Sequence, residues 1–365
     1  MQATNASSAL RALKRGLGIP ARSPLVVPLP RAVQRSDLPV NDAQYLASPK
    51  ADGERVFVLL FTDTAGCRHF CLITRGHQVT DMDAVVCARV PAEFFCDTLL
   101  DAEWLPERGE LLLFDCYRVC GHGVADLSYP DRLALALIWV DRVAACDGVE
   151  EAGAMFTHPR AVRVLANEAA ERRADDRVPR AADVWGKAPG TRPRHAGFRA
   201  GGVRVSVKPV FYVRDSAALC AHRWPCATDG LVYTPRNPAV GLDTLKYKQD
   251  HTVDFMVRPC PRVTLTESAD LPYQRVDGNV GLFQYNGRSR AHELYSSANY
   301  VPSADLPPLA VDTVWEFRWD AAAGAWRFVR LREDKTRANE SRTVASTVQC
   351  VREAVRPDEL FALSK

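Results

Sequence analysis

The sequence lacks a long apolar run and a recognisable targeting segment. No hydrophobic stretch approaches the roughly 20 residues that a membrane helix needs, so we expect no membrane partner. The segment Met1–Arg22 carries Arg11, Lys14 and Arg15, but no apolar core follows these cations. This pattern argues against a signal peptide and predicts a basic, loosely ordered tail.

The sequence also lacks a disulfide framework. Its 11 cysteines are odd in number and scattered, which favours reduced thiols and an intracellular location. Cys220, His222 and Cys226 have no fourth ligand at zinc-binding spacing, so a structural role is expected. The net charge of +3 permits a basic surface but does not identify a partner.

A length of 365 residues predicts two domains. Residues 56–61 and 69–74 read as paired buried strands, and residues 132–143 have the spacing of a helix after Pro130 and Asp131. Strands and helices mix here without the regular alternation of a parallel sheet. The stretch 148–202 is rich in Ala, Arg, Glu and Pro and predicts a flexible insertion.

From about residue 250 the sequence changes to short strands separated by turn signals. Residues 314–319 and 326–331 flank the turn Asp320–Gly324 and predict a hairpin within a small antiparallel barrel. Residues 343–363 read as a terminal helix that is broken near Pro357.

The run Lys50-Ala51-Asp52-Gly53-Glu54-Arg55 precedes the first buried strand. A lysine becomes a nucleophile when nearby cations and partial burial favour its neutral form. The Asp52–Gly53 turn could aim Lys50 into a cleft, and Arg55 offers a fork of donors for ribose or phosphate. Taken alone, this run is more often an ordinary surface turn.

Further segments with charged or aromatic side chains follow at the ends of apolar strands. Cations at such positions could bind phosphates, and acidic side chains could bind a hard metal ion. Each has an ordinary structural reading by itself, such as a solvated lysine face or a turn. In chain order they are Asp101-Ala102-Glu103, Phe114-Asp115, Thr228-Asp229-Gly230, Leu245-Lys246-Tyr247-Lys248 and Arg330-Leu331-Arg332-Glu333-Asp334-Lys335.

In this order and spacing, the segments resemble the covalent lysyl-nucleotidyltransferase superfamily of capping guanylyltransferases and polynucleotide ligases. The resemblance covers roughly residues 47–339, without the long insertion. Leu245–Lys248 with Thr252-Val253-Asp254-Phe255, and Trp326-Arg327-Phe328 leading to Asn339, are similar to mRNA-capping guanylyltransferases. In size and layout the chain resembles the stand-alone capping enzymes of large DNA viruses.

The resemblance implies an α+β fold. It consists of a nucleotidyltransferase domain with ATP-grasp-like antiparallel sheets and helices, at residues 1–249, and a C-terminal OB-fold barrel at residues 250–342. We expect residues 343–365 to pack back on the first domain. An intracellular site follows, and for a viral enzyme this would be the host nucleus, the replication site or the virion.

The resemblance also implies a reaction. Lys50 would attack the α-phosphorus of GTP, release pyrophosphate and then pass GMP to the 5′-diphosphate end of RNA. Mg²⁺ or Mn²⁺ would be the cofactor, with Glu103 and Asp229 as its ligands. The implied nucleotide-binding residues are Arg55, Arg75, Glu103, Phe114, Asp229, Lys246, Lys248, Asp254, Arg332, Asp334 and Lys335.

The resemblance assigns tasks to most of these residues. Arg55 and Arg75 would contact ribose and phosphate, Phe114 would stack on guanine, and Lys246 and Lys248 would hold the α-phosphate. Arg332, Asp334 and Lys335 would reach the β- and γ-phosphates when the domains close.

Ala51 and Ala102 depart from the family, which usually has Thr and Gly there. Both substitutes are small enough for the fold, but Ala51 removes a possible hydroxyl contact. A glycine-rich methyltransferase fingerprint is missing. Only Cys350 and Arg356 have the spacing of a cysteine-based triphosphatase loop, and we read this match as chance. A separate cap methyltransferase and a separate RNA triphosphatase are therefore the expected partners. An ATP-dependent polynucleotide ligase using the same lysine, and a non-enzymatic RNA-binding barrel protein, are the alternatives.

Overall fold

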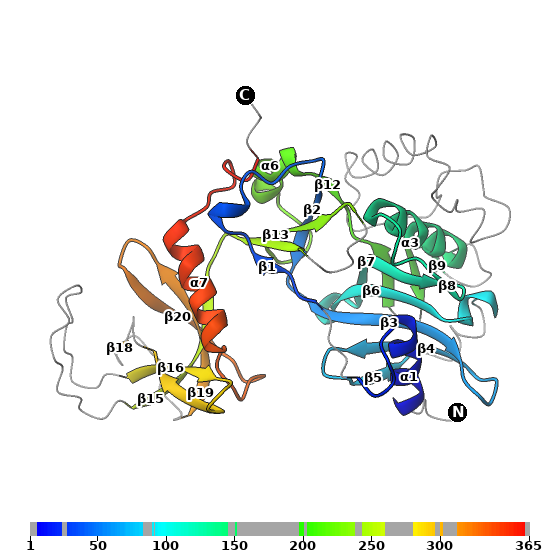
Figure 1. Ribbon diagram of the computed structural model, residues 1–365, viewed down its shortest axis with the longest axis horizontal. Coiled ribbons are helices and arrows are strands. Elements are labelled where there is room, and N and C mark those ends of the chain that lie inside the picture. Colours follow the sequence, from blue (N-terminus) through cyan, green and yellow to red (C-terminus); the bar gives the residue numbers. More distant parts are fainter. Residues whose placement is uncertain are drawn as a thin grey trace. The chain divides into compact units, whose positions relative to one another are not determined.

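A computed structural model describes residues 6–23, 28–82, 90, 92–144, 150–151, 197–200, 203–237, 243–259, 280–295, 300–301 and 312–361. Most of the predicted insertion at 148–202 lies outside these residues. The described part mixes helices with three largely antiparallel sheets, so the predicted α+β class is confirmed (Figure 1). No helix in that part is long and apolar enough to cross a membrane.

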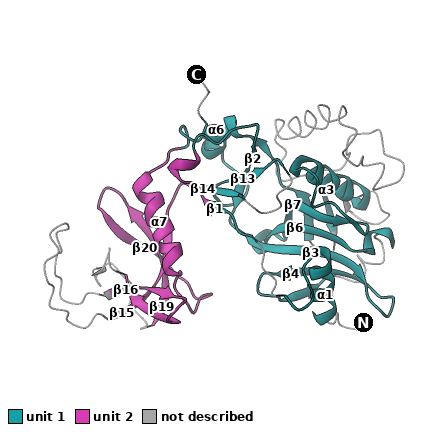
Figure 2. Ribbon diagram, viewed as in Figure 1, with its two compact units in different colours: residues 1–31, 38–247, 357–365 teal, residues 32–37, 248–356 magenta. Residues whose placement is uncertain are grey.

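The chain divides into two compact units (Figure 2). Unit 1 contains residues 1–31, 38–247 and 357–365, and unit 2 contains residues 32–37 and 248–356. The boundary between the units falls between Tyr247 and Lys248, two residues before the position expected from the sequence. Unit 2 also includes residues 32–37. The sequence pattern did not indicate that this N-terminal segment belongs to the second unit.

Unit 1 holds a five-stranded sheet in which distant segments of the chain become neighbours. The strand order is β1-β14-β13-β2-β12. Strands β13 and β2 run antiparallel, with an irregularity where Thr228 pairs with Ala51 and Leu231 pairs with Pro49. The bounds are β1 Arg31–Ala32, β2 Tyr45–Ala51, β12 Phe211–Tyr212, β13 Thr228–Pro235 and β14 Leu245–Lys248.

The second sheet of unit 1 has the order β5-β4-β3-β6-β7-β11-β10-β9, with β8 paired to β7. The predicted hairpin of residues 56–61 and 69–74 is confirmed as β3 and β4. The first half of the sheet is β3 Glu54–Thr62, β4 Arg68–Thr74, β5 Val79–Asp81, β6 Thr98–Leu105 and β7 Glu110–Val119. The remainder is β8 His122–Gly123, β9 Glu150–Glu151, β10 Gly197–Ala200 and β11 Val203–Val207.

Helix α3 (Tyr129–Ala144) confirms the predicted helix and lies against the central strands. The backbone N–H of Asp131 donates to the Ser128 hydroxyl, which therefore caps the first turn. Trp139 of α3 is fully buried in the main apolar core with Phe70, Phe94 and Phe198. A short helix, α6 (Ser216–Ala221), precedes β13.

Helix α1 (Ala6–Gly16) corrects the expectation of a loosely ordered N-terminal tail. Ala9, Ala12 and Leu13 are buried in a second apolar cluster, together with β3 residues such as Phe57 and Phe61. The basic residues that suggested a tail lie on the helix, outside this buried stripe. Small apolar residues at three- to four-residue spacing thus decided the structure of this segment.

Unit 2 is an antiparallel sheet with the order β17-β16-β15-β19-β20, covered by helix α7 (Ser341–Glu353). The predicted hairpin of residues 314–319 and 326–331 is confirmed as β19 and β20. The strands are β15 Thr252–Pro259, β16 Val280–Asn286, β17 Ala291–Leu294, β18 Tyr300–Val301, β19 Thr313–Asp320 and β20 Ala325–Leu331.

Helix α7 belongs to unit 2, whereas the sequence-based expectation placed it on the first domain. Val344 is fully buried in the core of unit 2, with Phe255, Phe317 and Trp326. The helix ends at residue 353, and only the segment from residue 357 groups with unit 1, where Val40 donates to the Leu360 carbonyl. Helical periodicity shows which face is apolar but not which core receives it.

Candidate active site

Lys50 and Asp229 form the centre of the candidate site. Lys50 lies near the end of β2, and its Nζ is 2.7 Å from Oδ1 of Asp229 on β13. The two side chains are 23% and 29% exposed, so the pair is sheltered but accessible. Asp229 occupies the irregular part of the β13–β2 pairing, and such bulges redirect side chains next to functional sites.

The turn after Lys50 is pressed against β6. A Cβ added to Gly53 would lie 2.7 Å from the Trp104 carbonyl oxygen and 2.7 Å from Cγ of Glu103. Only glycine fits there without a shift of the backbone. The neighbouring Ala51 is buried against Leu105 and Leu112, so the small residue at this position packs in an apolar environment.

Strand β14 brings the two predicted lysines into the same sheet. Leu245 and Tyr247 are buried, whereas Lys246 and Lys248 are partly exposed, so the lysines share one face as predicted. The order β14-β13-β2 therefore places the lysine strand next to the strand of Asp229, which pairs with the strand of Lys50. Three segments separated by up to about 200 residues meet at this sheet.

Arg55, at the start of β3, is held by a buried carboxylate. Its Nε and Nη2 donate to the two oxygens of Asp101 at 3.0 and 2.6 Å, and Nη1 donates to the Pro28 carbonyl at 2.9 Å. Asp101 is fully buried. Burial by itself would lower the pKa of Arg55, but the Asp101 carboxylate outweighs it and raises the pKa. Arg55 is thus a fixed cation.

Glu103, predicted as a metal or ribose ligand, lies two residues further along β6. Its Oε2 accepts from Nζ of Lys208 at 3.1 Å. Lys208 follows β11 and is 3% exposed, so it is a buried lysine rather than a solvated one. The position of Lys208 directly after a strand with buried residues is the sequence signal that could have indicated its burial.

Phe114, predicted to stack on guanine, lies on β7 between two cations. The ring centroid is 5.7 Å from Cζ of Arg55 and 5.6 Å from Nζ of Lys208. The β6–β7 pairing skips Phe114, since Asp101 pairs with Asp115 and Ala102 pairs with Leu113. A bulge thus sets the direction of this half-buried ring.

Arg75 lies immediately after β4, and its side chain is exposed. Because Val56 pairs with Thr74, the next positions along the hairpin place Arg55 and Arg75 at the same end of the sheet. The sheet register therefore groups both arginines on the side of the Lys50 turn. Their predicted contacts with a nucleotide stay predictions.

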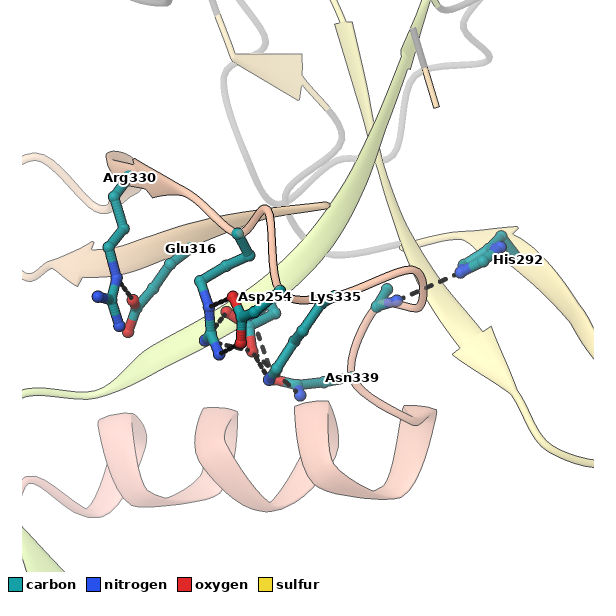
Figure 3. A network of polar contacts seen from close by, with 9 residues as sticks. Asp254, His292, Glu316, Arg330, Lys335 and Asn339 are labelled. Carbon is teal, nitrogen blue, oxygen red and sulfur yellow. Dashed lines mark hydrogen bonds and ion pairs between the residues drawn. The ribbon is translucent and has the colours of Figure 1, made fainter. Parts of the chain in front are cut away.

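In unit 2, four further predicted residues form one network (Figure 3). Asp254 on β15 accepts from Nη1 of Arg332 at 3.0 and 3.1 Å and from Nζ of Lys335. Arg332 also donates to both oxygens of Asp334, and this hydrogen bond lowers the pKa of Asp334 to about 2. The sequence segments after β20 and within β15 are thus tied together.

Asn339, which ends the motif similar to capping enzymes, completes this network, although the sequence pattern assigned it no role in the site. The backbone N–H of Asp254 donates to Oδ1 of Asn339 at 2.9 Å, and the backbone N–H of Asn339 donates to the Asp254 carbonyl at 2.8 Å. Figure 3 shows Asp254, Lys335 and Asn339 pointing toward one another. Asp254 is 5% exposed, so these contacts offset the cost of burying its charge.

The described residues contain no group of three or more metal-binding side chains. Glu103 and Asp229 nevertheless fit the donor set of Mg²⁺, which often takes one or two carboxylates and keeps waters and phosphate oxygens as its other ligands. Each carboxylate is paired with a lysine in this structure.

Cys220 is half-buried, and burial raises the pKa of its thiol to about 11, as for a structural thiol.

Comparison with known proteins relates this chain to mRNA capping. Residues 250–361 match the family described as mRNA capping enzyme, C-terminal domain. The chain is 30% identical over 159 residues to the mRNA-capping enzyme subunit alpha of Neurospora crassa, covering 37% of this chain and 39% of that relative. The match therefore spans about two fifths of the relative's length.

Solved structures of DNA ligases show a weaker likeness. Mycobacterial DNA ligase D complexed with ATP and MES has a TM-score of 0.39 and 14% identity, over 85% of this chain and 96% of that chain. Chlorella virus DNA ligase-adenylate has a TM-score of 0.28 and 10% identity, over 85% and 100% of the two chains. The family and sequence matches confirm the predicted resemblance: the chain is similar to the mRNA-capping enzymes, and residues 250–361 correspond to their C-terminal domain.

Proposed function

We propose that this chain is an mRNA guanylyltransferase. GTP reacts with Lys50 to give a covalent lysyl-GMP intermediate and pyrophosphate, and the GMP then passes to the 5′-diphosphate end of RNA to form the GpppN cap. The observation that carries the proposal is the sheltered Lys50–Asp229 pair, 2.7 Å apart, in the sheet that also bears Lys246 and Lys248.

The first step joins nitrogen to phosphorus. Lys50 loses a proton to solvent before it attacks, and the Asp229 carboxylate, 2.7 Å from Nζ, would orient the resulting amine. The neutral amine attacks the α-phosphorus, a P–N bond forms, and the bond from the α-phosphorus to the bridging oxygen breaks. Pyrophosphate leaves with that oxygen, so the nucleotide keeps one phosphate.

The cations on and near the Lys50 sheet balance the charge of this step. Phosphoryl transfer depends mostly on positioning and on neutralising developing charge. Lys246 and Lys248 would hold the α-phosphate, and Arg55 and Arg75 would contact ribose and phosphate. A divalent ion held by Glu103 and Asp229 would neutralise phosphate charge.

Base and RNA recognition extend the proposal. Phe114 offers a half-buried aromatic face on which guanine would stack. The RNA must arrive with a diphosphate end and leave with an unmethylated cap. A separate RNA triphosphatase and a cap methyltransferase are therefore the proposed partners.

Covalent labelling tests the proposal. The full chain is incubated with Mg²⁺ and either GTP or ATP labelled at the α-phosphorus, and protein-bound label is measured after denaturation. We expect label from GTP and little from ATP. Lys50→Ala and Lys50→Arg should take none, since arginine stays protonated.

Lys14→Arg is the matched control, because Lys14 lies on α1 and donates to the Ala21 carbonyl. It should label like the wild type. Preferential labelling by ATP would assign the chain to the ligase reaction, and label retained in Lys50→Ala would remove Lys50 from the chemistry.

A further inference from the structure

One tyrosine hydroxyl contacts the carboxylate that holds Arg55. The hydroxyl of Tyr117 on β7 donates to Oδ2 of Asp101 at 2.9 Å, and the same oxygen accepts from Nη2 of Arg55 at 2.6 Å. Nη2 also lies 3.4 Å from the tyrosine oxygen. The three side chains therefore form a closed triangle across β3, β6 and β7.

Burial makes this triangle sensitive to each member. Asp101 is fully buried and Tyr117 is 7% exposed, so water does not replace a lost partner easily. A buried carboxylate needs several hydrogen bonds to offset its desolvation. Removing the tyrosine hydroxyl would leave Oδ2 with Arg55 as its remaining described partner.

The triangle also fixes which way Arg55 faces. Two edges of the guanidinium are engaged, by Asp101 and by the Pro28 carbonyl, and the side chain is 16% exposed. The guanidinium lies 5.7 Å from the ring centroid of Phe114. Its orientation therefore sets where a cation stands beside the proposed base-stacking ring.

We propose that Tyr117 is a positioning residue, which holds Arg55 through Asp101 in the orientation that contacts the nucleotide. The proposal rests on the proposed function for its nucleotide, but not for its geometry. Tyr117 itself touches no reacting atom in this scheme. Burial raises the pKa of its hydroxyl well above the usual value, so the hydroxyl stays a donor throughout the usable pH range.

The first experiment needs no nucleotide. With arginine labelled by ¹⁵N, solvent exchange of the Arg55 Nε–H is measured by NMR in the full chain. Tyr117→Phe should speed this exchange by about tenfold, because a hydrogen bond to a charged group is lost from the triangle. Tyr233→Phe is the matched control, since its buried hydroxyl donates to Ser216 in the same unit.

The second experiment measures label formation against GTP concentration. Tyr117→Phe should raise the half-saturating concentration about tenfold while changing the maximal rate less than about threefold, because the lost contact acts on nucleotide binding. In an Arg55→Lys background the same substitution should add less than about twofold, since lysine has no Nη2 for the triangle to position.

The outcomes of these experiments test the positioning role of Tyr117 separately from the proposed guanylyltransferase function. An unchanged Arg55 exchange rate in Tyr117→Phe, or an equal change in Tyr233→Phe, would overturn the positioning role. A full additive effect of Tyr117→Phe in the Arg55→Lys background would overturn it as well. If neither GTP nor ATP labels the wild type, the proposed function fails, and the exchange experiment still decides the role of Tyr117.

Discussion

At Gly53 the backbone has no room for a side chain. The turn that follows Lys50 lies so close to β6 that an added Cβ would meet the Trp104 carbonyl, a backbone atom that cannot rotate away. The residue identity thus fixes how closely the turn after Lys50 approaches β6. Sequence alone gives the turn, whereas the contact with β6 comes from the sheet.

We therefore expect Gly53→Ala to lower the free energy of unfolding by about 1–3 kcal/mol through overpacking. Label formation should fall more than stability suggests, because the turn carries the nucleophile. Gly123→Ala is the control, since its Cβ would meet nothing within 4 Å. Denaturant unfolding and GMP labelling of both variants measure this, and equal behaviour of the two would contradict the close-approach argument.

Among the elements, helix α3 is joined to the central sheet by a buried ion pair. Nε and Nη2 of Arg132 donate to the two oxygens of Asp115 on β7 at 2.6 and 3.0 Å, and Arg132 is 1% exposed. Helix α1 uses the same bidentate arrangement between Arg15 and Asp97, but there the arginine side chain is 56% exposed. The two pairs differ in burial rather than in geometry.

Burial predicts different costs for breaking these pairs. Arg132→Ala leaves a carboxylate buried without its cation and should lower the free energy of unfolding by about 3–5 kcal/mol. Arg15→Ala should lower it by less than about 1 kcal/mol, because water replaces the lost partner. Urea unfolding followed by tryptophan fluorescence compares them, and similar losses in both variants would show that burial does not decide the cost.

For the whole molecule, the predicted phosphate-binding residues fall into two groups in different units. Lys246 belongs to the sheet of Lys50 in unit 1, whereas Arg332 and Lys335 belong to the Asp254 network of unit 2. In the proposed reaction the α-phosphate is present in both steps. The leaving pyrophosphate exists only in the first step. The two groups should therefore be separable by kinetics.

Arg332→Ala should slow lysyl-GMP formation by about 100-fold, as loss of a donor to developing charge does. Transfer of GMP from labelled enzyme to diphosphate RNA should change much less. Lys246→Ala should slow both steps, since a cation helps wherever charge develops on the α-phosphate. Single-turnover assays of each half-reaction measure this. Equal losses in both steps for both variants would refute the division of labour, although the enzyme class would stand.

The sequence by itself determined the α+β class, the hairpins β3–β4 and β19–β20, helix α3 and the resemblance to capping enzymes. These features depend on local periodicity and on chemical residues in a fixed order along the chain. Lys50 and Lys246 were recognisable as candidate site residues because the residues next to them in sequence resemble the motifs of the nucleotidyltransferase superfamily.

Only the tertiary structure decided features that depend on contacts between distant segments. Lys208 is buried beside Glu103, although the two residues are far apart in the chain. Hydrogen bonds likewise join distant residues in the triangle of Arg55, Asp101 and Tyr117, and between Asn339 and Asp254. Periodicity likewise could not assign helix α7 to unit 2, nor show that α1 packs on β3. Local sequence specifies which face of an element is apolar, but only the folded chain determines which partner covers it, because many cores can accept the same apolar stripe.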